Sequence, residues 1–133
     1  RYLFVDRERE SLRISHRALV NGELVLALCD QHASEVASPL LSLFNRRIAP
    51  PVGAMRLALR LNVPCYAAIL FPKEKSWQLY IRQLPVKHGL EALAQSYLAA
   101  LEDWVRVEPS AWQGWDWFLE LPLDDDLHDK NSA

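Results

Sequence analysis

The chain has 133 residues, of which 50% are hydrophobic and 24% charged, and its formal net charge at pH 7 is −2. This composition is that of one globular domain with a sizeable core, and no apolar run approaches the roughly 18 residues that a membrane-spanning helix needs. Cys29 and Cys65 each lie in an apolar stretch, which favours buried thiols over a disulfide or metal pair and suits a reducing compartment.

The amino-terminal half predicts helices alternating with strands. The sequence begins at Arg1, and the apolar stretch Tyr2 to Val5 is typical of a strand, so we expect a chain cut from a longer protein. The elements expected next are a helix from Asp6 to Asn21-Gly22, a strand at 24–28, a loop over 30–50 with a helical turn at 39–44, a helix from Pro51 to Asn62 and a strand at 64–71. The continuous apolar run Leu24–Leu28 is the pattern of a buried parallel strand.

The carboxyl-terminal half predicts a hairpin, a long helix and a tail. Its expected elements are a turn at 73–75, a strand at 77–82, a helix at 89–106 and a short last helix at 109–117. We therefore expect an α/β domain over residues 1–119, with a mostly parallel sheet flanked by helices and one antiparallel hairpin, incomplete at its amino end. Residues 120–133 are acidic and are expected to form a disordered tail.

Basic residues concentrate in the middle of the chain. From Arg46 to Lys87, eight basic residues stand against one acid, Glu74. Such a bias indicates an anionic partner, for instance phosphate groups, a carrier protein bearing phosphopantetheine or a lipid surface. The alternative is an ordinary solvated surface. The candidate residues for binding phosphate are Arg46, Arg47, Arg56 and Arg60, because guanidinium groups donate paired hydrogen bonds in a fixed fork.

A second candidate position follows the predicted strand at 24–28. Ligands of open α/β sheets bind beyond the carboxyl ends of the strands, so Asp30 is expected to line a substrate pocket, with Gln31 a weaker candidate beside it. The arginines are expected to converge near Asp30. The alternative for Asp30 is a loop cap that accepts backbone hydrogen bonds, and for the arginines a salt-bridged surface.

Two other kinds of site are disfavoured by spacing. Cys29 and His32 are three residues apart and point to opposite sides of an extended segment, which argues against a local cysteine–histidine pair. The cysteines and histidines also lack the paired spacings of a zinc site. We therefore expect no metal and no cofactor. The tryptophans near the end of the domain are expected to cluster; they are Trp104, Trp112, Trp115 and Trp117.

Five short motifs follow one another in an order known from one enzyme family. They are Arg13, Leu19 and Asn21-Gly22 leading to Cys29-Asp30-Gln31; Leu43-Phe44-Asn45; Pro51-Val52-Gly53-Ala54-Met55-Arg56-Leu57-Ala58; Asn62-Val63-Pro64-Cys65-Tyr66; and Pro109-Ser110-Ala111-Trp112. In this order they resemble the carboxyl-terminal part of the bacterial late acyltransferases of lipid A biosynthesis. This lauroyl and myristoyl transferase family belongs to the lysophospholipid and glycerolipid acyltransferase superfamily. The similarity covers roughly residues 10–118.

The resemblance implies an acyltransferase at the cytoplasmic face of the bacterial inner membrane, peripheral as this chain stands. It implies transfer of a fatty acyl chain from an acyl carrier protein or acyl-CoA thioester to a hydroxyl of a glycolipid of the lipid A type, without a cofactor and without a nucleic-acid partner. In the superfamily, a histidine acts as the general base and a carboxylate five positions later orients it.

That catalytic signature does not occur in this sequence. The residues five positions after His16, His32, His88 and His128 are Asn21, Ala37, Leu93 and Ala133. No catalytic residue is therefore identified, and we expect the isolated chain to lack acyltransferase activity. Two alternatives stay open: a non-catalytic acyltransferase-like module that binds anionic lipid or a partner protein, and an unrelated α/β domain.

Overall fold

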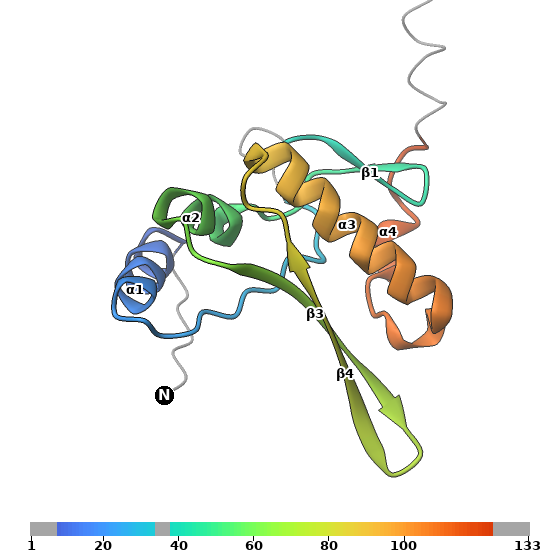
Figure 1. Cartoon of the computed structure of the whole chain (residues 1–133). Helices are drawn as coiled ribbons and strands as arrows, with labels where there is room; N and C mark the ends of the chain where they lie inside the picture. The colour runs from blue at the N-terminus through green and yellow to red at the C-terminus, as the bar shows by residue number, and fades with distance from the viewer. Residues whose placement is uncertain (1–7, 34–37, 124–133) are drawn as a thin grey trace, which may run out of the picture.

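The computed structural model describes residues 8–33 and 38–123 (Figure 1). Its elements are, in chain order, α1 (Glu8–Val20), β1 (Leu41–Leu43), β2 (Arg46–Ile48), α2 (Gly53–Leu61), β3 (Cys65–Lys73), β4 (Ser76–Leu84), α3 (Gly89–Val107), the 3-10 helix η1 (Pro109–Ala111) and α4 (Trp115–Phe118). The described strands form two antiparallel pairs, β1–β2 and β3–β4. The fold is thus mixed α/β.

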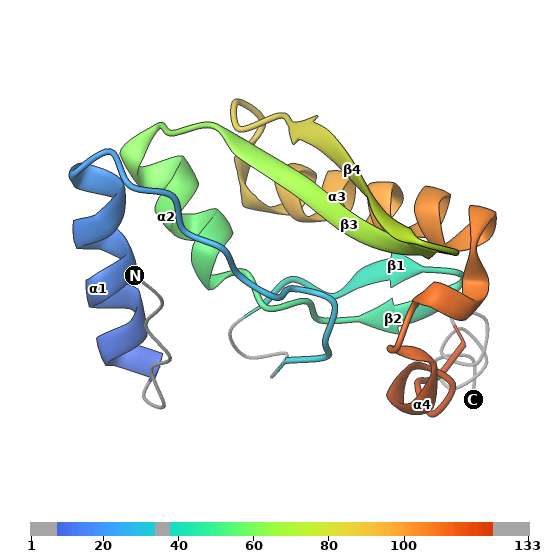
Figure 2. The ribbon, with the colours of Figure 1, turned by 90° about the horizontal axis from the view of Figure 1, so that it is seen from below.

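The core is organised around α3. Apolar residues recur along this helix at helical spacing, and those that are buried are Leu93, Ala94, Leu98, Ala100, Leu101, Trp104 and Val105. Strands β1, β3 and β4, helix α2 and η1 all pack against α3. Each large apolar side chain buried in this way stabilises the fold by about 1.5–3 kcal/mol. Helix α1 packs on α2, at the far end of the molecule from α4 (Figure 2).

The β3–β4 hairpin is long and covered on one face. Its ladder runs through nine cross-strand pairs, from Cys65 opposite Leu84 to Lys73 opposite Ser76. Alternate residues along a strand point to opposite faces. Ala67 and Phe71 are buried on the face toward α3, as is Leu84, and the alternate residues lie on the outer face, away from the helix.

The β1–β2 turn requires an unusual backbone. Its two central residues, Phe44 and Asn45, both have positive φ, 46° and 59°, as the favoured two-residue hairpin turn demands. This conformation is unfavourable for a bulky residue such as phenylalanine. The Phe44 ring is held against three aromatic neighbours, with centroid distances of 6.4 Å to Trp112, 5.9 Å to Trp115 and 5.9 Å to Phe118.

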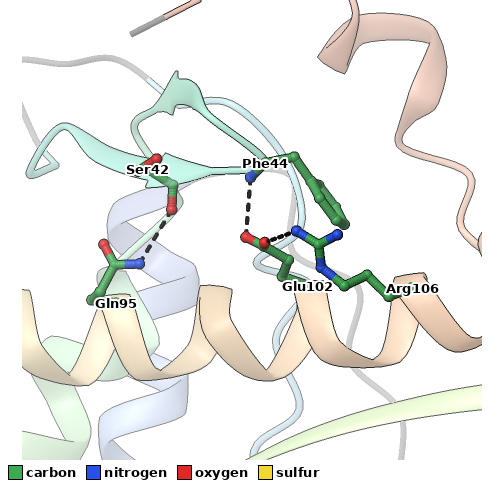
Figure 3. Close-up of polar contacts among 5 residues, drawn as sticks. All are labelled: Ser42, Phe44, Gln95, Glu102 and Arg106. Carbon is green, nitrogen blue, oxygen red and sulfur yellow. Dashed lines mark hydrogen bonds and ion pairs between the residues drawn. The ribbon is translucent and has the colours of Figure 1, made fainter.

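Polar contacts from α3 fix the same hairpin (Figure 3). The backbone N–H of Phe44 donates to Glu102 Oε2 at 3.1 Å, and Gln95 Nε2 donates to the carbonyl oxygen of Ser42 at 3.2 Å. Arg106, one turn after Glu102, forms an ion pair with it at 2.5 Å, and the Arg106 guanidinium lies 5.1 Å from the Phe44 ring centroid. The turn is therefore tied to α3 through both its backbone and its ring.

The apolar run at 24–28 is not a strand in the described structure. It is extended but pairs with no sheet, and Leu24, Leu26 and Leu28 are 88%, 79% and 72% exposed. The expected parallel pairing of this run with residues 64–71 is not formed, and the described sheets are antiparallel. An apolar run becomes a strand only where another strand satisfies its backbone hydrogen bonds, and none of the described strands occupies that position.

Two shorter predictions were also wrong. Residues 39–44 do not form a helical turn, because Leu41 and Leu43 are buried on alternate positions of β1 and the chain folds back at Phe44. The helix expected at 109–117 is broken into η1 and α4 by Trp112, whose backbone is extended. Burial of the Trp112 ring, which is 4% exposed, outweighs the local preference for a continuous helix.

Several other local predictions were confirmed, although the helix expected from Pro51 begins at Gly53. Helix α1 ends at Asn21-Gly22, where Gly22 has φ 76°, and Asn62 closes α2 in the left-handed conformation, as residues at helix ends commonly do. The hairpin and the long helix lie where they were expected. The Tyr2–Val5 stretch, the Asp6 cap and residues 124–133 of the predicted tail lie outside the described residues.

Candidate functional site: a cationic cleft between α1 and α2

Helices α1 and α2 enclose a cleft of about 370 Å³. The residues that line it are Leu12, Arg13 and His16 of α1, and Gly53, Arg56, Leu57 and Arg60 of α2. On each helix the spacing of three or four residues places these side chains on one face. The helices approach closely at Gly53, where a Cβ atom would lie 3.3 Å from Leu12 Cδ2, and the arginines flank this contact.

The lining combines positive charge with two leucines. Three guanidinium groups and one imidazole line the cleft, and no carboxylate is among the described residues that line it. Among the side chains that the structure describes, in residues 10–33 and 38–123, Arg13 and Arg60 form no ion pair. Guanidinium groups bind phosphate and carboxylate through paired, charge-assisted hydrogen bonds. The cleft is therefore suited to an anionic group attached to an apolar one.

The structure separates the four predicted arginines. Arg56 and Arg60 lie in the cleft, whereas Arg46 and Arg47 lie on β2, which is beside α4 and opposite to α1 and α2 (Figure 2). Arg46 donates to the carbonyl oxygen of Leu121, and its guanidinium is 5.7 Å from the ring centroid of Phe118. The expected convergence near Asp30 was wrong, because residues 46–48 pair with β1 instead of forming a loop that leads into the helix.

The first residues of the predicted tail contact the same region. The backbone N–H of Arg47 donates to the carbonyl oxygen of Pro122 at 3.4 Å, and Leu123 forms an isolated bridge with Arg46. Residues 121–123 therefore run along β2. The Arg46 guanidinium contacts a backbone carbonyl and an aromatic ring, an arrangement that fixes residues 121–123 against β2.

Asp30 contacts the aromatic core and does not line the cleft. Its Oδ2 accepts a hydrogen bond from the indole Nε1–H of Trp112 at 3.3 Å. Burial raises the pKa of the neighbouring Cys29 thiol to about 11, with smaller contributions from Cys65 and Asp30, and burial likewise raises the pKa of Tyr97. Gln31, the next residue, is exposed. Asp30 therefore contacts a buried aromatic side chain, which differs from the backbone cap given above as its alternative role.

The histidines in the described ranges are not paired with carboxylates. His16 lines the cleft, and His32 Nδ1 accepts the backbone N–H of Ala49 at 3.3 Å. His88 immediately precedes α3, and its side chain makes no capping hydrogen bond. No group of three or more residues that could hold a metal ion occurs in the part of the chain that the structure describes.

Sequence reasoning missed half of the cleft. Arg13 and His16 are one turn apart on α1, which is a visible signal of a polar face, but the sequence does not reveal that this face packs beside Arg56 and Arg60.

No helix among the described residues combines the length and the apolar character that crossing a membrane requires.

Comparisons of the chain with protein-family models, curated proteins and solved structures found no match.

Proposed function

We propose that the α1–α2 cleft binds the phosphate group of a lipid, and that the chain serves in this way in acyl transfer. In this proposal the reaction moves a fatty acyl chain from an acyl carrier protein or acyl-CoA thioester to a hydroxyl of a lipid A-type glycolipid, at the cytoplasmic face of the bacterial inner membrane. The motif resemblance supports the reaction class. The observation that carries the binding role is the set of three arginines, Arg13, Arg56 and Arg60, around one cleft.

The chemistry of the cleft favours a phosphorylated lipid over a simple anion. Arg13 and Arg60 approach from two different helices, so a phosphate held between them receives hydrogen bonds from opposite sides. Leu12 and Leu57 line the same cleft and offer apolar contact to the part of the lipid next to the phosphate. The arginine side chains are exposed, so their attraction for an anion is screened by salt.

The finer fold belongs to the same proposal. In the described structure the run at 24–28 is unpaired; we propose that a further strand pairs with it in an acyltransferase-like sheet, so that Asp30 stands at its carboxyl end. Exposure of Leu24, Leu26 and Leu28 supports this, because large apolar side chains gathered on one side of a segment ordinarily have a covering neighbour.

A non-catalytic lipid-binding module is the second candidate. It is favoured by the absence, within the described ranges, of a histidine hydrogen-bonded to a carboxylate, since the acyl transfer chemistry of the resembling enzymes needs such a base. The two candidates share the same ligand. They differ in whether the chain supports transfer from an acyl-CoA to a glycolipid acceptor, which a thin-layer assay of the radiolabelled product measures.

The binding role is tested by sedimentation with lipid vesicles. Wild type, Arg60→Ala and Arg17→Ala are mixed with phosphatidylcholine vesicles that contain or lack phosphatidic acid. Arg17 is the matched control, because it lies one turn after Arg13 on α1, is exposed and does not line the cleft. Loss of one exposed charge-assisted contact is expected to weaken binding by about 1 kcal/mol, roughly fivefold.

Three outcomes decide the proposal. The proposal is supported if binding requires phosphatidic acid, if Arg60→Ala weakens it and if Arg17→Ala leaves it unchanged. Equal binding by all three proteins contradicts it. Competition by coenzyme A identifies the phosphate source: if coenzyme A displaces the protein from vesicles and binds without them, the cleft serves the acyl donor and the lipid assignment fails.

A further inference from the structure

The outer face of the β3–β4 hairpin is an uncovered apolar surface. We define the outer face as the four adjacent cross-strand pairs that point away from α3. They are Tyr66 with Gln83, Ala68 with Ile81, Leu70 with Leu79, and Pro72 with Trp77. All eight residues are exposed. Figure 2 shows this face with α3 behind it and no other element in front.

The charge distribution of the hairpin is as uneven as its burial. No outer-face residue is an acid or a base of the Asp, Glu, Lys, Arg or His type. Arg82, in contrast, points to the inner face, where it forms an ion pair with Asp103 of α3 at 2.8 Å and lies 5.4 Å from the Trp104 ring centroid. An uncharged face of this kind needs no oppositely charged partner and is complementary to itself.

The area of the outer face fits a protein interface. Tyr66, Leu70, Trp77, Leu79 and Ile81 are between 49% and 66% exposed, which on side chains of about 200 Å² each gives roughly 600 Å². Leu24, Leu26 and Leu28 are also exposed, in the extended segment that follows α1. A patch of this size is at the upper end of what soluble monomers expose, and it supplies most of the roughly 800 Å² per partner that a standard interface buries.

We propose that the outer face is a dimer interface with a second copy of this chain. A twofold axis places the same patch of both copies in contact, and two sheets pack face to face about 10 Å apart with their strands roughly aligned. Leu79 and Ile81 of one copy then interdigitate with the outer face of the other. This interface is separate from the α1–α2 cleft, whose lining residues it leaves accessible.

The test is the mass of the 133-residue chain in solution, measured by size-exclusion chromatography with light scattering over a concentration series. The expected dimer has about 31 kDa, twice the 15.3 kDa of one chain. Leu79→Lys buries a charge at the centre of the interface and is expected to raise the dissociation constant at least about 100-fold. Gln78→Lys is the matched control, because Gln78 is the exposed neighbour on the opposite face of β4.

Ile81→Lys is a second variant at the same interface. Circular dichroism of every protein shows whether a change in mass reflects misfolding. The proposal is supported if the wild type and Gln78→Lys are dimers while Leu79→Lys and Ile81→Lys are folded monomers. A monomeric wild type overturns it, and so does a dimer that survives both variants. A monomer that sediments with phosphatidylcholine vesicles through Leu79 also overturns it and assigns the outer face to a lipid surface.

Discussion

Replacement of Asp30 separates a structural role of this carboxylate from a role in binding. Asp30 Oδ2 accepts the only hydrogen bond recorded for the Trp112 indole within the described structure, at 3.3 Å, and the Trp112 side chain is 4% exposed. Asp30→Ala leaves the indole N–H without an acceptor in the protein interior. A buried donor without an acceptor lowers the free energy of unfolding by about 1–3 kcal/mol. Asp30→Asn keeps an acceptor oxygen at the same position and is expected to lower it by less than about 1 kcal/mol.

The assay is equilibrium unfolding in urea at pH 7, followed by far-ultraviolet circular dichroism. Because domains of this size are stable by about 5–15 kcal/mol, a loss of 1–3 kcal/mol is readily measured. Trp112→Phe and the double variant complete a mutant cycle, for which we expect a coupling free energy of about 1 kcal/mol between the two side chains. Vesicle binding is expected to stay unchanged. Wild-type stability of Asp30→Ala together with lost vesicle binding would refute the structural assignment and restore Asp30 to the ligand site.

Two further predictions concern the same core. Gly114→Ala places a Cβ atom against the six-membered ring of Trp112 and is expected to lower the free energy of unfolding by about 1–3 kcal/mol. The control is Gln113→Ala, at the exposed neighbouring residue, which is expected to change this free energy by less than about 0.5 kcal/mol. Equal urea midpoints for the two variants would show that the Trp112 ring moves aside freely. Because burial raises the pKa of Cys29 from 9.0 to about 11, its alkylation at pH 8 is expected to be at least about 100-fold slower than that of an unperturbed thiol, which peptide mass spectrometry measures. Because the pKa is raised, the stabilisation associated with the neutral Cys29 thiol is complete below pH 9 and is lost as the pH rises toward 11. Cys29→Ala has no thiol, so its free energy of unfolding is expected to decline less steeply over this pH range.

Local signals in the sequence predicted most of the helices and the long hairpin. Gly22 and Asn62 supply the left-handed conformations that end α1 and α2, and the helical spacing of apolar residues predicts α3. These features depend on neighbouring residues only. The short β1–β2 hairpin was missed because its turn, with Phe44 at positive φ, is stabilised by contacts with α3 and the aromatic cluster that lie 53 or more residues away along the chain.

The candidate site was predictable only in part. The one-turn spacing of Arg56 and Arg60 correctly placed them on one face of α2, but nothing local indicates which helix packs beside them. Arg46 and Arg47 precede that helix closely in the sequence, yet the β2 strand directs them to the other end of the molecule. The apolar run at 24–28 predicts a strand by composition, and pairing of its backbone depends on a neighbour that the composition does not specify.

The central claim is that a phosphorylated lipid binds between α1 and α2. Its most direct test is a titration of the isotope-labelled chain with a short-chain, soluble phosphatidic acid, followed by amide chemical shifts in nuclear magnetic resonance spectra. We predict that the saturable shifts cluster on the lining of the cleft, at Arg13 and His16 of α1 and at Gly53 and Arg60 of α2, with Arg46 and Arg47 unaffected. Saturable shifts confined to β2 and α4, or no saturable shifts at all, would contradict the account.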